Sequence, residues 1–301
     1  MKVLSLFDGM SGGQIALQKL GAKVDNYYAS EIDKYAIQIA KKNFPDTIYL
    51  GDVKTVDARN LQIDLLMGGS PCQGFSRSRS NHLNFEDPRS KLFFEFVRIL
   101  EECNPKYFLL ENVPMNKQCQ DIITEYVGVE PIRINSNLVS AQSRERLYFT
   151  NIPNITQPKD MHIFLKDIID EEVGGVFEDK YLYQQYSNNF RRKSLTGVRR
   201  IGTATHIKGH DLMKRVYDIE GKSPTLNTCN GGNREPKIPV NKYLSTLSTS
   251  YWRRLTPLEF ERLQTVPDNY TEGVSNTQRY KMLGNGWTID VITHLLKSME
   301  M

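Results

Sequence analysis

One cysteine of this chain is placed where a nucleophile could act. Cys72 lies in the segment Gly-Gly-Ser-Pro-Cys-Gln-Gly, residues 68–74, which follows the apolar run 63–67 that predicts a buried strand. Pro71 fixes its own φ, and the glycines allow a sharp turn and a close approach to a ligand. A helix that began soon after Phe75 would favour the reactive thiolate through its positive end. The alternative is a small buried thiol beside a tight turn.

Acidic residues follow other predicted strands. A glycine-rich turn at 9–13 comes after the first apolar run, and the runs 27–30 and 47–50 are followed by Glu31 and Asp52. Open parallel sheets bind ligands at the carboxyl ends of their strands, where Glu31 could bind ribose hydroxyls and Asp52 an adenine amine. The turn departs from the dinucleotide glycine spacing, which favours a nucleotide-like ligand without a pyrophosphate, such as S-adenosylmethionine. The alternative is a tight turn flanked by surface carboxylates.

The first half of the chain alternates short apolar runs with helical patterns, which predicts an α/β fold with a parallel sheet. Expected strands cover 2–7, 27–30, 47–50, 63–67 and 107–110, and Glu111 directly follows the last of them. Helices are expected over 14–20 and around the periodic apolar residues Leu92, Phe93, Phe96, Val97 and Leu100. Further on, Thr256, Pro257 and Glu259 predict a helix start with a capping box, and Leu255 and Phe260 a hydrophobic staple.

Composition limits the class of protein. The chain has 301 residues, a net charge of +4 and four cysteines without a Cys-x-x-Cys pair. These features argue against a zinc site and a disulfide framework, so we expect no metal and a cytoplasmic protein. No stretch is typical of a signal peptide or of a membrane span.

Five short motifs carry a resemblance to a known family. They are Leu-Phe-Asp-Gly at 6–9, Ser-Pro-Cys-Gln at 70–73, Glu-Asn-Val at 111–113, Gln-x-Arg-x-Arg at 142–146 and Gly-Asn at 284–285. In this order and spacing they resemble the cytosine-C5 DNA methyltransferases, over nearly the whole chain apart from about 159–247. Segments 3–9 and 279–291 are also similar to the catalytic domain of animal de novo DNA methyltransferases. Ser11, where many members have glycine, and Trp287, where valine is common, depart from the pattern.

The resemblance implies a fold and a reaction. The fold would be a Rossmann-like S-adenosylmethionine-dependent methyltransferase domain, residues 1–165 plus 283–301, with a smaller, mixed target-recognition domain and hinge, residues 166–282. The reaction would be that of a DNA (cytosine-5-)-methyltransferase, in which Cys72 attacks carbon 6 of a flipped-out cytosine. Glu111 would protonate ring nitrogen 3, Arg144 would steady the base carbonyl, and Arg146 would hold the carboxylate network. Alternatively, Glu111 and Arg144 form a structural ion pair and Arg146 is structural too.

The resemblance also implies which residues bind S-adenosylmethionine, whose product would be S-adenosylhomocysteine. They come from the turns after the expected strands and from the last motif, and they are Phe7, Gly9, Met10, Gly12, Glu31, Ile32, Asp52, Val53, Pro71, Leu92, Asn285 and Trp287.

The expected partner is double-stranded DNA. The polar segment after Cys72 would close over the phosphate backbone as a flap, with contacts from Gln73, Ser76, Arg77 and Arg79. From Arg191 to Arg215 there are eight Lys or Arg residues and one acid, and Arg199 and Arg200 within this run would neutralise phosphates. A basic run can equally be a solvated face.

Other functions compete with this hypothesis. One is an RNA methyltransferase of the same mechanism, although the relatives that modify transfer RNA lack a sizeable recognition insert, and this chain has about ninety residues there. Another is a non-catalytic homologue, although such proteins lose the Pro-Cys pair or the acid, which are present here. We expect a monomer without membrane contact. A cognate restriction endonuclease, phage self-protection and an orphan role are equally open.

Overall fold

The computed structural model describes residues 1–70, 91–170, 180–183, 197–204, 206–239 and 250–300. The chain forms two compact units. The first contains Met1–Asn135, Glu145–Pro158 and Val291–Met301, and the second contains Ser136–Arg144 and Lys159–Asp290. None of the described helices is long and apolar enough to cross a membrane.

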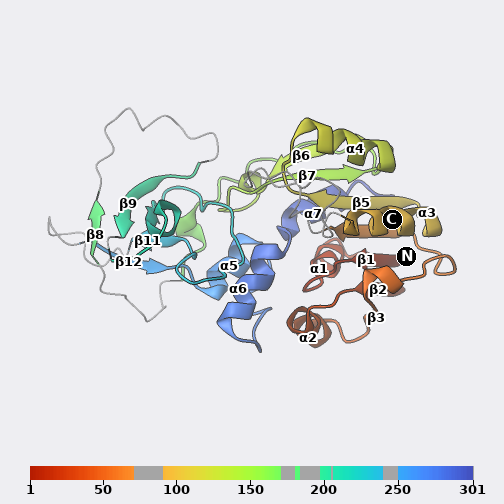
Figure 1. The fold of residues 1–301 in the computed structure, drawn as a ribbon, viewed down its shortest axis with the longest axis horizontal. Helices are drawn as coiled ribbons and strands as arrows, with labels where there is room; N and C mark the ends of the chain where they lie inside the picture. Colours follow the sequence, from red (N-terminus) through yellow and green to blue (C-terminus); the bar gives the residue numbers. More distant parts are fainter. Residues whose placement is uncertain (71–90, 171–179, 184–196, 205, 240–249, 301) are drawn as a thin grey trace. The chain divides into compact units, whose positions relative to one another are not determined.

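A seven-stranded sheet organises the first unit (Figure 1). Its strands are β1 (Lys2–Leu6), β2 (Asn26–Ser30), β3 (Ile48–Gly51), β4 (Leu65–Gly69), β5 (Tyr107–Asn112), β6 (Ile132–Asn135) and β7 (Glu145–Thr150). Their order is β3-β2-β1-β4-β5-β7-β6. Strands β1 to β5 run parallel, and β7 runs antiparallel to both of its neighbours. The predicted α/β fold is confirmed, and the five expected strands are found within two residues of their expected bounds.

Helices cover both faces of this sheet. They are α1 (Gly12–Lys19), α2 (Lys34–Asn43), α3 (Leu92–Cys103), α4 (Lys117–Val127) and α7 (Ile289–Leu296), with a short 3-10 turn, η1 (Val53–Thr55). On one face α3 packs so closely that a Cβ added at Gly68 of β4 would lie 2.9 Å from the Phe96 ring. On the other, a Cβ at Gly13 of α1 would lie 2.5 Å from Cε of Met67. The two glycines therefore set the spacing between helix and sheet.

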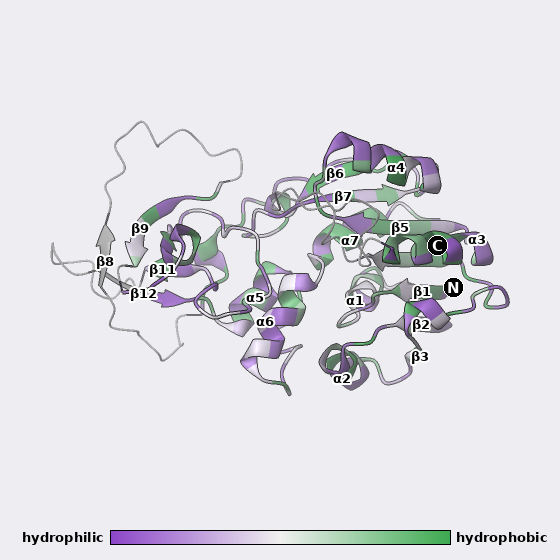
Figure 2. Ribbon diagram, viewed as in Figure 1, coloured by the Kyte–Doolittle hydropathy of each residue, from purple (hydrophilic) through white to green (hydrophobic). Residues whose placement is uncertain are grey.

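The core follows the expected periodicity. Phe93, Phe96 and Val97 of α3 are buried against β1, β4, β5 and β7, whereas Leu92 and Leu100 are only partly buried. Figure 2 shows β5 as mostly apolar along its length and α4 with a hydrophilic side and an apolar side. The apolar sides of α3 and α4 thus both belong to the core that includes the strands of the sheet.

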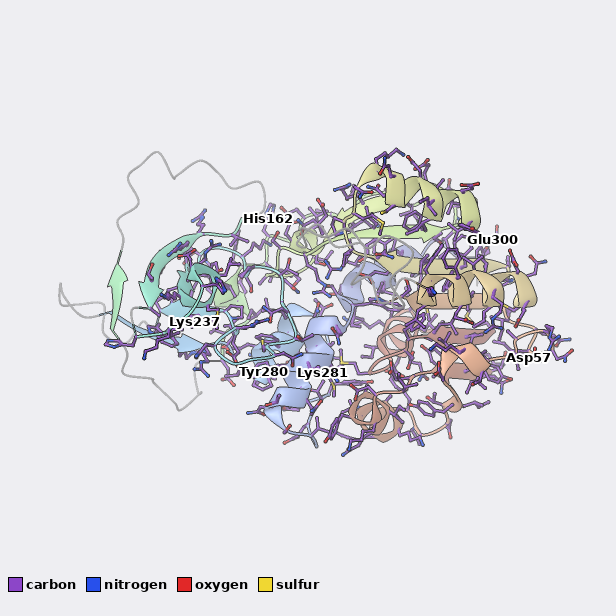
Figure 3. All side chains as sticks on the ribbon, in the orientation of Figure 1. Asp57, His162, Lys237, Tyr280, Lys281 and Glu300 are labelled. Carbon is purple, nitrogen blue, oxygen red and sulfur yellow. The ribbon has the colours of Figure 1, made fainter. Side chains whose placement is uncertain are left out.

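The second unit contains a closed barrel with the strand order β10-β11-β12-β8-β9. Its elements are η2 (Ser136–Leu138), η3 (Leu165–Asp167), β8 (Lys180–Tyr183), β9 (Arg200–Ala204), η5 (Asp211–Lys214), β10 (Arg215–Tyr217), β11 (Lys237–Pro239), β12 (Ser250–Arg254), α5 (Pro257–Leu263) and α6 (Asn276–Asn285). Trp252, Val216, Ala204 and Ile207 form a small apolar core. Lys237 (labelled in Figure 3) is 1% exposed, and its ammonium lies 5.6 Å from the centre of the Trp252 ring. Burial lowers the pKa of Lys237 to about 8.

The start of α5 has the predicted capping box. Thr256 Oγ1 accepts the Glu259 N–H at 3.2 Å, and the Glu259 carboxylate accepts the Thr256 N–H at 2.7 Å. Pro257 occupies the first helical position, and Leu255 and Phe260 are fully buried. The predicted capping box and the proline at the first helical position are confirmed, and the predicted hydrophobic staple stays a prediction.

Candidate active site

The loop after β1 makes an unusual turn. Phe7, Gly9 and Ser11 have φ values of 56°, 61° and 64°, in the left-handed region. A residue other than glycine costs roughly 1–2 kcal/mol in this conformation, so the loop needs compensating contacts. A Cβ added at Gly9 would meet no atom within 4 Å, so the space beside this glycine is open.

Glu31, directly after β2, clamps that loop. Its Oε2 accepts the Gly9 N–H at 2.8 Å, and its Oε1 accepts the N–H groups of Ile32 and Asp33 at 2.7 and 2.8 Å. The sequence predicts that Glu31 binds a ligand, and it does not predict the bond to Gly9. A carboxylate has about four acceptor positions, so these three bonds orient Glu31 and leave room for one more donor. Beside it, the Ile32 side chain is 75% exposed.

Asp52 follows β3 and begins η1. Its Oδ1 accepts the Lys54 N–H at 3.1 Å, while Val53 is buried. Gly51 has a φ of 78° and faces open space. The carboxyl ends of β1, β2 and β3, which are neighbours in the sheet, therefore bring the loop, Glu31 and Asp52 to one edge.

The other residues expected in this site differ in exposure and in the unit to which they belong. Met10 is 2% exposed, Gly12 is the buried first residue of α1, and Phe7 and Leu92 are partly buried against the core. Asn285, the last residue of α6, is exposed, and Trp287 is half-buried. Both belong to the second unit.

Asp8 is a residue that sequence reasoning missed. It is 8% exposed, and its carboxylate accepts hydrogen bonds from the hydroxyls of Ser11 at 2.5 Å and Tyr27 at 2.8 Å. Burial raises the pKa of Asp8 to about 6, although these hydrogen bonds favour the charged form, and the nearby charge of Glu31 raises it further. The feature of the sequence that could have marked Asp8 is its place directly before the glycine-rich turn at 9–13.

The next strand pair carries a second group of site residues. In the parallel pair β4–β5, Gly69 lies opposite Glu111, and the buried Ser70 follows. The next residues expected to act on the base or the DNA lie outside the described residues; they are Pro71, Cys72, Gln73, Ser76, Arg77 and Arg79.

Glu111 forms an ion pair with Arg146 of β7. The distance from Arg146 Nε to Glu111 Oε1 is 2.8 Å, and each side chain is 13% exposed. Arg146 also donates from Nη1 to the Glu145 carbonyl at 2.8 Å. Glu111 is thus paired with Arg146, whereas the structural alternative considered from the sequence pairs it with Arg144.

Arg144 has different contacts within the second unit. Its guanidinium is buried and donates to the carbonyl oxygens of Leu226, Gly284 and Gly286 at 3.0–3.1 Å. The backbones it joins are very close, because a Cβ added at Gly284 would lie 2.2 Å from the Asn227 carbonyl oxygen. Arg144 therefore holds the loop at 226–227 against the end of α6.

The two arginines expected to contact DNA differ in exposure. The Arg199 side chain is 60% exposed, and its Nη1 lies 3.9 Å from Asp218 Oδ2. Arg200 is 24% exposed, and its guanidinium donates to both carboxylate oxygens of Asp211 and to the Thr203 hydroxyl. Arg199 is therefore the more available cation.

The strand order is that of a Rossmann-like S-adenosylmethionine-dependent methyltransferase fold, and solved structures share it. The methyltransferase EhMeth of Entamoeba histolytica matches with a TM-score of 0.73 at 17% identity, covering 99% of this chain and 97% of that one. A DNA modification methyltransferase described as putative, from the Escherichia coli prophage Cp, matches with a TM-score of 0.68 at 22% identity over 99% and 98% of the two chains.

The family follows from the sequence. The model of the C-5 cytosine-specific DNA methylase family matches residues 1–301, and the chain belongs to this family. Similar relatives include the orphan methyltransferase M.SPBetaI of Bacillus phage SPbeta, 27% identical over 99% of this chain and 97% of its own length. The type II methyltransferase M.HhaI of Haemophilus parahaemolyticus is 29% identical over 98% and 93%. The protein is a DNA (cytosine-5-)-methyltransferase.

Proposed function

We propose that the enzyme transfers the methyl group of S-adenosylmethionine to carbon 5 of a cytosine flipped out of a specific duplex DNA site, through a covalent bond between Cys72 and carbon 6. The observation that carries this proposal is the pairing of Gly69 with Glu111, which lies 2.8 Å from Arg146. Cys72 follows Gly69 by three residues, which span at most about 11 Å.

The chemistry assigns a role to each group. The Cys72 thiolate forms a bond to carbon 6 while Glu111 gives a proton to nitrogen 3, and the electron pair of the carbon 5–carbon 6 double bond becomes available at carbon 5. When bound, S-adenosylmethionine supplies an electrophilic sulfonium methyl group to carbon 5. Water then takes the carbon 5 proton, the double bond forms again, and Cys72 leaves as a thiolate. Nitrogen 3 returns its proton to Glu111.

The contacts of the two arginines support different roles from those implied by the resemblance. Arg146 is beside Glu111 and is suited to steady the base carbonyl as charge develops. Arg144 is bound to three backbone carbonyls and is suited to hold the shape of the second unit.

The edge formed by β1 to β3 fits the methyl donor. Gly9 and Gly51 leave open backbone, Glu31 retains an acceptor position for a ribose hydroxyl, and Asp52 can accept from an adenine amine. The exposed Ile32 offers an apolar surface for the adenine ring. Phe7, Met10, Gly12, Val53, Leu92, Pro71, Asn285 and Trp287 are proposed as further donor-binding residues.

Access to carbon 6 requires the base to leave the stack. The proposed flap residues are Gln73, Ser76, Arg77 and Arg79, and the exposed Arg199 is a proposed phosphate contact. Relatives are named as orphan and as type II methyltransferases, which supports a role with or without a cognate endonuclease.

Bisulfite sequencing of duplex DNA treated with the purified enzyme and S-adenosylmethionine tests the function. We expect protected cytosines within one short sequence, and none with Cys72→Ala, while donor binding by this variant stays nearly intact. Methylation by Cys72→Ala, or methylation of transfer RNA and not of duplex DNA, would refute the proposal.

Trapping tests the covalent step separately. DNA with 5-fluorocytosine at the identified site should form a stable adduct, because fluorine cannot leave as a proton does. Wild-type enzyme that methylates ordinary DNA but yields no adduct with fluorinated DNA would exclude the covalent route.

A further inference from the structure

A buried polar network supports the turn after β1. Ser11 is 0% exposed and has φ 64° and ψ 43°, a conformation that serine rarely adopts. Its hydroxyl donates to Asp8 Oδ2, and its N–H donates to the Asp8 carbonyl at 3.1 Å. Asp8 Oδ1 accepts from the Tyr27 hydroxyl at 2.8 Å, which connects the turn to β2.

Gly13 leaves space for the Tyr27 hydroxyl in this network. A Cβ added at Gly13 would lie 2.8 Å from the Tyr27 hydroxyl oxygen. Only a residue without a side chain at this position lets Tyr27 reach Asp8. Gln14 adds a bond from Nε2 to the Ser11 hydroxyl at 3.3 Å and to the Thr47 hydroxyl at 2.7 Å. The network therefore spans the turn, α1, β2 and the segment before β3.

We propose that Asp8, Ser11 and Tyr27 act together as positioning residues that hold the turn in the conformation required to bind the methyl donor. This inference rests on the proposed donor site, since Gly9, bound to Glu31, lies between Asp8 and Ser11 in the chain. None of the three residues needs to touch the donor, because they act on it through the backbone.

The charge state of Asp8 links this network to pH. Both hydroxyls donate to it, and only the carboxylate offers two acceptor oxygens without also requiring an acceptor for a proton of its own. The described ionisable groups with the clearest effect on Asp8 are Glu31 and Tyr27 of the β2 region, Tyr49 of β3 is also coupled to it, and none of these three is a cation. With a pKa of about 6 for Asp8, protonation begins within an accessible pH range. Donor binding should therefore weaken as the pH falls through about 6.

Calorimetric binding of S-adenosylhomocysteine to the full chain tests the inference without turnover. Asp8→Asn should weaken binding about tenfold or more at pH 7.5, because it replaces two hydrogen bonds to a charged group with at most one bond to a neutral oxygen. Tyr27→Phe should weaken it about three- to tenfold for the same reason. Tyr28→Phe is the matched control on the same strand, because none of the described residues bonds its hydroxyl, and it should bind like the wild type.

A second pair of variants distinguishes an effect on the conformation of the turn from a general loss of stability. Ser11→Ala loses the hydroxyl and keeps the strained conformation, so binding should weaken about tenfold. Ser11→Gly adopts the same conformation freely and should bind within about threefold of the wild type. This comparison holds even where Asp8→Asn does not fold.

The pH profile provides the remaining test. The affinity of the wild type should fall between pH 7 and pH 5.5, and the profile of Asp8→Asn should be flatter. Equal affinities of wild type and Asp8→Asn at pH 7.5, parallel pH profiles, or equal losses in Ser11→Ala and Ser11→Gly would overturn the inference. Absence of binding by the wild type itself would instead overturn the proposed donor site, and the inference with it.

Discussion

Glu111 and Arg146 bring opposite charges to within 2.8 Å in a setting where each side chain is 13% exposed. Such a partly buried pair is expensive to separate, so a base that enters must offer replacement contacts to both groups. The ring nitrogen 3 and the carbonyl of cytosine are suited to do so. Under the proposed mechanism, Glu111 and Arg146 therefore both bind the flipped-out cytosine.

Glu111→Gln should lower the rate of methyl transfer by about a hundredfold or more, because glutamine cannot supply the proton to nitrogen 3. Binding of S-adenosylhomocysteine should be unchanged within about twofold, since no described contact joins Glu111 to the β1–β3 edge. Single-turnover methylation and calorimetry measure the two quantities. Glu145→Gln is the control: its pair with Arg133 is 40–43% exposed, and it should keep nearly full activity. A rate for Glu111→Gln close to that of the control contradicts the role.

Arg144→Met should mainly reduce stability. The change leaves the buried carbonyl oxygens of Leu226 and Gly284 without this donor, which should cost about 2–3 kcal/mol, whereas the Gly286 carbonyl keeps a bond from Gln264 Nε2 at 3.1 Å. Urea unfolding measures this loss, and Arg133→Met, at an exposed ion pair, serves as the control. A loss of less than about 1 kcal/mol with a large fall in rate would return Arg144 to the reaction.

Residue types and spacing identified part of the site. Glu31, Asp52 and Glu111 each follow an apolar run, so their positions at strand ends could be predicted. Asp8 could not be selected, because its importance depends on burial and on Tyr27, nineteen residues away in the chain. The different contacts of Arg144 and Arg146 were equally hidden, because they depend on which unit each residue joins.

The capping box at α5 begins a helix and also connects this helix to other elements through Glu259. Glu259 is 0% exposed, and besides the Thr256 N–H it binds both terminal nitrogens of Arg253 at 2.6 and 2.8 Å. Its Oε1 also accepts the Asp170 N–H at 3.1 Å. One carboxylate thus connects β12, α5 and the segment near 170.

Thr256→Ala should lower the free energy of unfolding by about 1 kcal/mol, because the Glu259 N–H loses its side-chain acceptor. Thr256→Ser keeps the hydroxyl and should stay within a few tenths of a kcal/mol of the wild type. Urea unfolding of both variants measures the difference. Equal stabilities would mean that the cap contributes nothing to the described fold.

The elements differ in how far the sequence predicts them. Strands β1, β4 and β5 are apolar runs bounded by turn residues, and buried parallel strands have this pattern. The barrel strands are short and carry charges, as in Arg-Val-Tyr at 215–217 and Ser-Tyr-Trp-Arg-Arg at 250–254. Their order depends on pairings between distant segments, which periodicity does not encode. The family resemblance therefore implies a second, mixed domain, and the sequence pattern does not predict the barrel within it.

At the scale of the whole molecule, Asp8 links stability to pH. Its pKa is raised from 3.8 to about 6, so the folded state binds the proton more tightly than the unfolded state. The stability from protonated Asp8 is present below about pH 4 and is lost as the pH rises through 6. A pKa shift of about two units corresponds to a change of up to about 3 kcal/mol in the free energy of unfolding over the full titration.

Urea unfolding between pH 4.5 and 7.5 should show this loss. The stability of the wild type minus that of Asp8→Asn should decrease over this range by about 2 kcal/mol, because asparagine does not titrate and part of the full effect lies below pH 4.5. A constant difference would show that Asp8 does not titrate in this window. The expected decrease is opposite in sign to the expected pH dependence of donor binding. The buried carboxylate would then be a cost in stability retained for function.

Binding of DNA by the whole molecule should depend on salt through its exposed cations. Each phosphate contact contributes about one unit to the slope of log affinity against log salt concentration. Arg199 is 60% exposed, so Arg199→Ala should reduce this slope by about one unit. Arg200 already donates to Asp211 and Thr203, so Arg200→Ala should change the slope less.

Arg59→Ala is the control for a general loss of positive charge, because Arg59 forms an exposed pair with Asp57, which is labelled in Figure 3. Equal slopes for the wild type and Arg199→Ala, measured by titration of duplex DNA at several salt concentrations, would exclude Arg199 as a phosphate contact. A larger effect of Arg200 than of Arg199 would mean that DNA displaces Asp211 from its guanidinium.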